Sequence, residues 1–486
     1  MNFKDLSLIE IIEKIKSGET TSKEVFDYFV KRIEKYDSKV KAFNYINKDG
    51  LQENTDSLLA GVPIAVKDIF CETNIPTTSA SKMLELFKPP YDSTVIKNLK
   101  EAGISSLGKV NMDQFAMGST GESSVFGATI NPWGTNRIPG GSSSGSAAAV
   151  SAGLAPAALG TDTGGSIRQP ASVCGIVGFK PSYGRNSRFG VNAMASSLDC
   201  PGTLTKTVKD AAILYNIMNG EDPLENTTIA GKDIIDDKIW ETKSLKGFKV
   251  GVPKEYFEEG LDAGVRKTIE EAIEKMRELG AEIKQVSLPT TKYAIATYYI
   301  LMPAEVSTNL ARLDGIRYGH NSDLPHESLD ELYLNNRGEG LGDEAKRRIM
   351  IGSYVLSAGF YDAYYKKAAA VRTLIIKDFK KVFEEVDVIV GPVSPSVAWK
   401  LGEKTDDPLK MYLSDAYTIP ASLAGLPAIS VPCGFAESED SEKEKLPVGL
   451  HMITPQYEEQ RLLEIAHVYE QATNWKEKMI PEGFED

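Results

Sequence analysis

The chain has 486 residues, of which 42% are hydrophobic and 25% charged, with 41 glycines and 24 prolines. These fractions are typical of globular proteins and exclude collagen-like, coiled-coil and largely disordered chains. Asp and Glu outnumber Lys and Arg by 68 to 55, which gives a net charge of −13. An acidic chain lacks the clustered cations of a general nucleic-acid-binding surface, although it can still dock to a partner that holds a nucleic acid.

The four cysteines are too few for a disulfide framework, and their spacing does not match a CxxC zinc site: Cys71, Cys174, Cys200 and Cys433. The sequence therefore predicts free thiols in a reducing cytosol and no metal site. Residues 1–19 carry charges every few positions, unlike a signal peptide, and no stretch approaches the roughly 18 apolar residues that span a bilayer. We expect a soluble, cytoplasmic protein.

Residues 1–60 have helical periodicity, with a capping box formed by Thr21 and Glu24. Residues 62–66 then alternate as a strand that ends at Lys67, and a helix (93–102) and a short strand (104–107) follow. Residues 110–205 are rich in Gly, Ser and Thr but keep small apolar residues between them. This composition indicates tight turns packed around a site rather than a flexible linker.

Strands and helices alternate again after residue 205, with strands expected at 248–252, 281–288, 387–391, 428–431 and 448–453. A helix is expected at 263–279 and a helical block at 290–385. The alternation predicts an α/β fold with a mixed, mostly parallel central sheet, covered by helices on both faces, plus a helical layer. We assign residues 1–486 to one large domain, with 1–60 as its N-terminal helical segment, 61–205 as its catalytic core and 290–385 as the helical layer.

Two clusters of Gly and Ser, at 140–146 and 160–168, are candidates for chemistry. Glycine-rich loops at helix N-termini can bind phosphate, but neither cluster matches GxxxxGK[ST] or GxGxxG. In the second cluster, Ser166 lies between a strand-like segment (157–160) and an expected helix. At such a turn, backbone N–H groups can converge beside a serine hydroxyl, which would form an oxyanion hole next to its nucleophile.

A serine nucleophile needs a base. The chain has four histidines, all outside the Gly/Ser region and better explained as surface or packing residues: His320, His326, His451 and His467. A Ser-His-Asp triad therefore lacks local support, and the alternative base is a lysine made neutral by burial. Lys67, at the end of an apolar strand, suits that role, but spacing alone leaves equally open that it simply pairs with Asp68.

These motifs closely resemble those of the amidase-signature family. The tract from Gly140 to Pro181 is similar to the family signature, and Asp162-Thr-Gly-Gly-Ser166-Ile-Arg168 is similar to its nucleophile motif. The resemblance covers essentially the whole chain. One departure is Ser144, where the family often has glycine; a residue this small is not expected to change the chemistry.

The resemblance implies a Ser–cis-Ser–Lys triad made of Ser166, Ser142 and Lys67. In that triad Ser166 attacks an amide carbonyl, while Ser142, on a cis peptide, relays the proton towards neutral Lys67. The expected oxyanion hole consists of the backbone N–H groups of four consecutive residues: Thr163, Gly164, Gly165 and Ser166.

Within the family, the chain is most similar to the A subunits of the glutamyl-tRNA(Gln)/aspartyl-tRNA(Asn) amidotransferases, through stretches at 115–120, 187–190, 195–199, 309–318, 346–349 and 361–366. Such subunits hydrolyse glutamine and pass ammonia to a companion subunit, where ATP-activated glutamate on a tRNA captures it. The resemblance thus implies glutamine as the substrate, companion subunits B and C, and a charged tRNA held mainly by the companion. It implies no cofactor in this chain, with ATP and Mg used by the partner. The alternative is a stand-alone amidase acting on a small or aryl amide.

A free glutamine needs a guanidinium for its α-carboxylate and a carboxylate for its α-ammonium group. By resemblance these are Arg348, or Arg347 if the register slips by one, and Asp415. Four further residues are expected to border the same pocket: Tyr299, Met117, Gly118 and Ser119. The alternatives are that the arginines are solvated on a charged helix and that Asp415 caps a helix.

Overall fold

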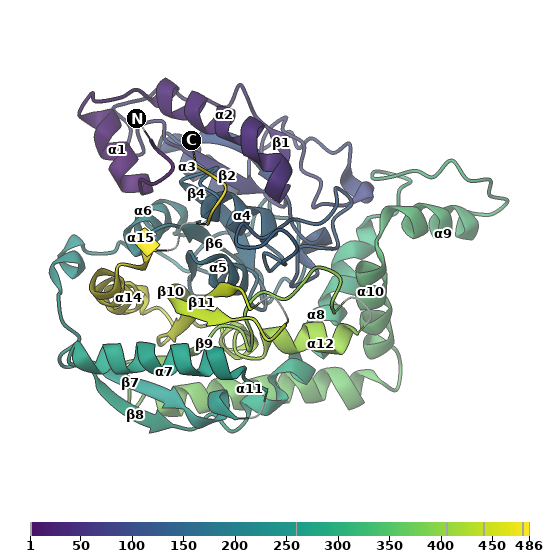
Figure 1. Cartoon of the computed structure of the whole chain (residues 1–486). Coiled ribbons are helices and arrows are strands. Elements are labelled where there is room, and N and C mark those ends of the chain that lie inside the picture. The colour runs from purple at the N-terminus through teal and green to yellow at the C-terminus, as the bar shows by residue number, and fades with distance from the viewer. Residues whose placement is uncertain (1, 259, 405–406, 441–442, 479–480, 486) are drawn as a thin grey trace.

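A β-sheet of eleven strands forms the centre of the computed structural model, which describes residues 2–258, 260–404, 407–440, 443–478 and 481–485 (Figure 1). The strands are β1 Phe43–Ile46, β2 Pro63–Lys67, β3 Ser105–Val110, β4 Ala157–Asp162, β5 Val177–Lys180, β6 Cys200–Thr205, β7 Lys249–Pro253, β8 Glu282–Val286, β9 Val388–Pro392, β10 Ala428–Glu437 and β11 Lys445–Ile453. Their order across the sheet is β1-β3-β2-β4-β6-β5-β10-β11-β9-β7-β8. The α/β fold with a mixed sheet is thus confirmed.

The sheet is not mostly parallel, and that part of the expectation is wrong. Only the pairs β2–β3, β2–β4, β7–β8 and β7–β9 are parallel, whereas the other six adjacent pairs are antiparallel. A parallel pair needs a crossover connection, usually a helix. The segment between β5 and β6 contains no helix, and β10 returns directly to β11 as its antiparallel partner. Because strands and helices alternate elsewhere in the chain, the sequence did not indicate that these strands are joined without a helix and pair antiparallel.

Helices cover both faces of the sheet, and the interior strands β2, β3, β4, β5, β6 and β9 are buried along their full length. The helices are α1 Leu8–Lys16, α2 Ser22–Val40, α3 Thr94–Glu101, α4 Ser144–Ser151, α5 Arg168–Cys174, α6 Val208–Met218, α7 Ala263–Glu278, α8 Ala294–Asn309, α9 Leu329–Gly340, α10 Asp343–Leu356, α11 Lys366–Val382, α12 Pro408–Tyr412, α13 Ile419–Leu423, α14 Glu459–Thr473 and α15 Trp475–Lys478. None of them, in the ranges described, combines the length and apolar character that crossing a membrane requires.

The N-terminal 60 residues are helical only in part. The predicted capping box is present at the start of α2, where Thr21 accepts from the Glu24 backbone N–H and the Glu24 carboxylate accepts from the Thr21 N–H. Residues 43–46 form β1, which corrects the expectation of an all-helical segment. This edge strand is short and only half-buried, so it carries no apolar repeat that would reveal it in the sequence. It is held in the sheet by its backbone pairing with β3.

The block at 290–385 consists of α8, α9, α10 and α11, as its periodicity predicts. In Figure 1, α8, α9 and α10 lie towards the right of the protein and α11 lies along its lower edge. Helix α8 packs against both α10 and α11. Helix α9 and the loop before it project away from the rest of the chain.

The pairing of β2 with β4 and the packing of α4 on both strands place the candidate catalytic residues together. Strand β2 carries Lys67 at its C-terminal end and pairs with β4, so the turn that follows β4 begins beside Lys67. Helix α4 packs on both strands, and its N-terminal approach brings Ser142 to the same point. Residues far apart in the sequence therefore meet at one end of two adjacent parallel strands.

Candidate active site

The amine of Lys67 is fully buried among hydroxyl groups. Its Nζ donates to Ser142 Oγ at 2.9 Å, Ser143 Oγ at 2.9 Å and Thr161 Oγ1 at 2.8 Å. Burial lowers the pKa of Lys67 to about 7, although the carboxylates of Asp113, Asp162 and Asp199 oppose that fall. Lys67 can therefore lose its charge near neutral pH while keeping its hydrogen bonds.

Lys67 does not pair with Asp68, so that alternative is wrong. The Asp68 carboxylate accepts from the backbone N–H of Thr78 at 2.9 Å, from the Thr78 hydroxyl and from the Asn44 amide. Strand β2 ends at Lys67 and Asp68 begins the turn that follows it, where its side chain meets Thr78 and Asn44 instead of the Lys67 amine.

The loop that carries Ser142 is held in place by the buried residue Asp113. The Gly141–Ser142 peptide bond is cis. The Asp113 backbone N–H donates to Ser142 O at 3.2 Å, and its carboxylate accepts from the Gly121 N–H at 3.0 Å. A Cβ added at Gly141 would lie 2.0 Å from Asp113 Oδ2, so only glycine fits at this position. The loop from 117 to 121 and the Ser142 loop are thus joined through Asp113.

Ser166 lies in a turn fixed by an ion pair. The Asp162 carboxylate accepts from the Ile167 and Arg168 backbone N–H groups, at 3.3 and 3.4 Å, and from Arg168 Nε at 2.9 Å. Burial would raise the pKa of Asp162, but the Arg168 guanidinium outweighs it and keeps that pKa below its ordinary value. Ser166 is 8% exposed whereas Lys67 and Ser142 are 0% exposed, so Ser166 is the residue of the three that a substrate can reach.

Two side chains, Tyr298 and Thr418, pack closely against the backbone between Asp162 and Ser166. A Cβ at Gly164 would lie 2.8 Å from the Tyr298 ring, and a Cβ at Gly165 would lie 2.4 Å from Thr418 Oγ1. The Ser143 N–H also donates to Ser166 O at 3.2 Å, which joins this turn to the Ser142 loop. Glycine at both positions therefore allows a close approach that a side chain would block.

The amidase family's sequence profile matches residues 24–463. The chain belongs to the amidase family. The A subunit of the glutamyl-tRNA(Gln) amidotransferase from Nitrosococcus oceani is 50% identical over 489 aligned residues, which cover 98% of this chain and 99% of that protein. The crystal structure of the corresponding A subunit from Thermotoga maritima has a TM-score of 0.81 at 41% identity, covering 97% of this chain and 95% of that one. A peptide amidase from Stenotrophomonas maltophilia has a TM-score of 0.80 at 27% identity, covering 97% and 98% of the two chains.

The two candidate arginines for substrate binding, Arg348 and Arg347, differ in how deeply they are buried. Arg348, in α10, is 2% exposed, and its Nε donates to Glu344 Oε1 at 2.8 Å. Burial would lower the pKa of Arg348, but the Glu344 carboxylate outweighs it and raises that pKa. The side chain of Arg347 is 41% exposed and pairs with the other Glu344 oxygen. The structure thus separates the two arginines, with Arg348 turned into the protein and Arg347 towards solvent.

Asp415 does not cap a helix, so that alternative is also wrong. It ends a single 3₁₀ turn, and its Oδ2 accepts from the Ser119 hydroxyl at 2.6 Å. Burial raises the pKa of Asp415 to about 7, although the Ser119 hydrogen bond and the Arg348 guanidinium oppose that rise. A cation bound beside Asp415 would stabilise its ionised form.

Two of the predicted pocket residues contact the candidate charged groups directly, Tyr299 at Arg348 and Ser119 at Asp415. Tyr299 stacks on Tyr412, with ring centroids 3.8 Å apart, and the Arg348 guanidinium lies 5.4 Å from the Tyr299 centroid. Met117 and Ser119 are buried in the loop held by Asp113. Gly118 lies in the same loop, where an added Cβ would come within 2.4 Å of Asp113 Cγ.

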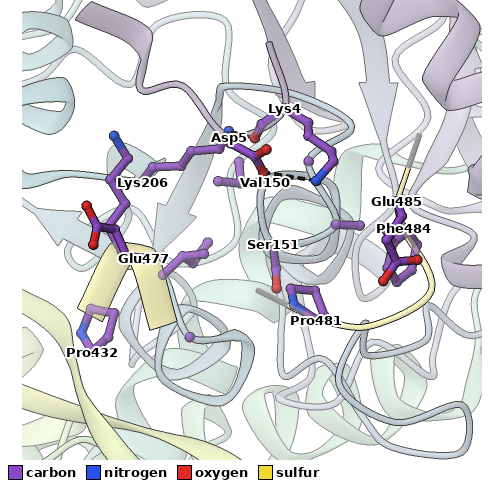
Figure 2. Close-up of a pocket in the computed structure, with 15 residues that line it drawn as sticks. Lys4, Asp5, Val150, Ser151, Lys206, Pro432, Glu477, Pro481, Phe484 and Glu485 are labelled. Atoms are coloured by element: carbon purple, nitrogen blue, oxygen red, sulfur yellow. Dashed lines mark hydrogen bonds and ion pairs between the residues drawn. The ribbon is translucent and has the colours of Figure 1, made fainter. Parts of the chain in front are cut away.

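A second lysine with a lowered pKa shows what distinguishes the surroundings of Lys67. Lys206 lines a cavity of about 320 Å³ where the two ends of the chain meet (Figure 2). Burial lowers the pKa of Lys206 to about 7 as well, but its Nζ donates to the carbonyls of Lys4 and Leu6, the latter at 2.9 Å. Carbonyl oxygens have no proton to give, so a neutral Lys206 has nothing to activate here.

Of the four histidines, His320 and His326 lie near α9 with part of their surface exposed, and the other two are buried. His451 lies closer to the site than its position in the sequence indicates, because its Nε2 is 2.9 Å from Arg168 Nη1. Burial and the Arg168 charge hold the pKa of His451 well below its ordinary value, so the ring is neutral. Its contact is with a guanidinium rather than a serine hydroxyl, which supports its assignment as a packing residue.

The sequence argument missed several residues that contact the candidate triad or the turn that leads to Ser166. Ser143 and Thr161, which contact the Lys67 amine, lie inside the two predicted clusters, so the density of Ser and Thr there was a usable signal. Asp113, Tyr298 and Thr418 come from distant segments and carry no local motif that links them to the site.

Proposed function

We propose that this chain is the glutamine-hydrolysing A subunit of a tRNA-dependent amidotransferase. The observation that carries the proposal is its identity of about 50% with glutamyl-tRNA(Gln) amidotransferase A subunits, over nearly the full length of both chains. The peptide amidase shares the fold at 27% identity, so the fold alone would not favour one amide substrate over another.

Ser166 is the proposed nucleophile and Lys67 the proposed base. A neutral amine has two N–H donors and one lone pair, so among its three hydroxyl neighbours it can accept from one. We assign that proton to Ser142, which in turn takes the Ser166 proton as Ser166 Oγ attacks the amide carbon of glutamine. The proton then returns through Ser142 to the leaving nitrogen, the C–N bond of the tetrahedral intermediate breaks, and ammonia departs to leave a γ-glutamyl ester on Ser166.

The backbone N–H groups of Thr163, Gly164, Gly165 and Ser166 stabilise the negative oxygen of the tetrahedral intermediate. Each well-placed donor in such a site lowers the barrier by about 3 kcal/mol. Water then hydrolyses the ester by the same proton relay, which releases glutamate and restores Ser166.

Arg348 and Asp415 hold the two charged ends of glutamine in this proposal. A buried guanidinium suits the α-carboxylate, because both groups are planar and form paired hydrogen bonds. The ionised form of Asp415 suits the α-ammonium group. Tyr299 stacks beside Arg348 and limits its movement, while Met117, Gly118 and Ser119 border the space between the two charges.

The remaining chemistry belongs to companion subunits B and C in this proposal. The glutaminase chain needs no cofactor, whereas the companion uses ATP and Mg to activate the glutamyl-tRNA(Gln), or aspartyl-tRNA(Asn), that captures the ammonia. The net charge of −13 supports a division in which the companion holds the tRNA. We place the reaction in the cytoplasm and treat residues 1–486 as one domain, since strands from residue 43 to residue 453 share a single sheet.

The test is co-purification with candidate B and C subunits, followed by measurement of ammonia release from glutamine with and without charged tRNA and ATP. We expect a stable complex whose glutaminase activity disappears in the Ser166→Ala variant, while the variant still assembles. A chain that purifies alone and turns over small or aryl amides rapidly, with no use of glutamine, would instead be a stand-alone amidase.

A further inference from the structure

Asp199 forms a buried contact with the first residue of the candidate oxyanion hole. Thr163 Oγ1 donates to Asp199 Oδ1 at 2.7 Å, and the two residues are 2% and 5% exposed. Thr163 follows directly after β4, so its hydroxyl is the side-chain anchor nearest to the start of the turn that ends at Ser166. The orientation of the Thr163 peptide group depends on where this hydroxyl is held.

The Asp199 carboxylate is itself fixed by backbone donors. Its Oδ2 accepts from the Met194 N–H at 2.9 Å and from the Ala195 N–H at 3.0 Å, and its Oδ1 also accepts from Ala195 at 3.1 Å. Three separate donors therefore converge on one carboxylate, which needs both of its oxygens to satisfy them. An asparagine would offer one oxygen and turn an N–H₂ group towards the remaining donors.

The segment 194–199 is also attached to the helical block. The Ser197 N–H donates to Glu305 Oε2 at 2.8 Å, and Arg372 Nη2 donates to Ser197 O at 3.2 Å. Glu305 belongs to α8 and Arg372 to α11, so two helices hold the segment that presents Asp199. Because the segment is anchored in this way, the Asp199 carboxylate can hold the Thr163 hydroxyl in one position.

We propose that Asp199 is a positioning residue of the amide-hydrolysis reaction, which acts through the Thr163 hydroxyl to aim the Thr163 N–H at the oxyanion. This inference rests on the proposed oxyanion hole and deepens it. Asp199 touches no reacting atom, so its effect appears in the transition state rather than in substrate binding. Loss of the contact therefore lowers kcat and leaves KM nearly unchanged.

The test measures ammonia release from glutamine by the assembled complex, for wild type and for Asp199→Asn, Thr163→Val and Thr163→Ser. We expect Asp199→Asn and Thr163→Val each to lower kcat by about 10- to 100-fold, with KM changed by less than about threefold. Thr163→Ser keeps the hydroxyl and should stay within about threefold of wild type. The double variant Asp199→Asn/Thr163→Val should fall no further than the less active single variant, because both remove the same contact.

Asp210→Asn is the matched control, since Asp210 is another buried carboxylate, accepts from the Ile9 N–H and belongs to α6. Burial raises the pKa of both carboxyl groups to about 6. Asp210→Asn should leave kcat unchanged. An unchanged kcat in Asp199→Asn, a rise in KM alone, or additive losses in the double variant would each overturn the proposal.

A crystal structure of Asp199→Asn supplies a readout that does not depend on activity. The Thr163 peptide should rotate away from its wild-type direction, and an unmoved Thr163 peptide would overturn the proposal. If the wild-type protein hydrolyses a small amide but not glutamine, the proposed glutaminase function fails. The same variants are then judged on that amide, so the two failures are distinguishable.

Discussion

The charge state of Lys67 controls the rate in the proposed relay, because only the neutral amine can accept a proton from Ser142. With a pKa of about 7, about half of the Lys67 side chains are neutral at pH 7 and about 1% at pH 5. The rate of ammonia release at saturating glutamine should therefore fall by about 50-fold from pH 7 to pH 5. The sign follows from the base: activity rises with pH as the amine deprotonates, and it levels off above pH 8.

The Lys67→Arg variant tests the same point without a change of pH. A guanidinium keeps the positive charge and its N–H donors but does not deprotonate below pH 12, so it cannot serve as the base. We expect kcat to fall by about 10²- to 10⁴-fold, the usual contribution of general base catalysis. The assay is a coupled measurement of ammonia at saturating glutamine. Saturation matters because ionisation of Asp415, whose pKa is also about 7, affects glutamine binding.

Lys206→Met provides the control, because Lys206 has the same lowered pKa of about 7 but contacts only carbonyl oxygens at its Nζ among the described residues. Its pH–activity profile should match that of the wild type. A wild-type profile that is flat between pH 5 and pH 7, or a Lys67→Arg variant that keeps more than a tenth of the activity, would refute the role given to Lys67.

Arg348→Ala should raise the KM for glutamine by about 30-fold, equivalent to about 2 kcal/mol, while the exposed neighbour change Arg347→Ala stays within about twofold; equal effects in steady-state kinetics would contradict the assignment. Gly164→Ala should lower kcat at least about tenfold, because the new methyl group would lie 2.8 Å from an aromatic ring, whereas Gly338→Ala faces open space and should not change it. Thr21→Ala should lower the free energy of unfolding by about 1 kcal/mol in chemical denaturation through loss of the capping box, with kcat unchanged; an unaltered denaturation midpoint would contradict this.

Secondary structure was predictable for helices with one apolar face over several turns and for strands whose residues alternate regularly. Helix α7 and strand β2 are of this kind, and both lie within two residues of their expected bounds. Strand β1 could not be predicted in this way, because its four residues are half-buried and its partner is about 60 residues away in the sequence. Strand direction failed for a similar reason, since it depends on which strand the chain returns to and not on local periodicity.

Within the site, the sequence identified groups that share a short motif and missed groups that meet only in the fold. Asp162, Ser166 and Arg168 are close in sequence, so their motif could be read directly. The contact between Thr163 and Asp199 joins residues 36 positions apart, and no spacing rule predicts it. The choice between Lys67 as base and Lys67 as partner of Asp68 was open from spacing, and the partners of the two side chains in the fold decide it: Lys67 contacts hydroxyl groups, and Asp68 accepts from Thr78.

The most direct test of the account is to trap the acyl-enzyme. The complex is mixed with glutamine for milliseconds, quenched in acid, digested and analysed by mass spectrometry. The account predicts a γ-glutamyl adduct on the peptide that contains Ser166, absent from Ser166→Ala and strongly reduced in Lys67→Arg. An adduct on a different residue, or ammonia release at the wild-type rate by Ser166→Ala, would contradict it.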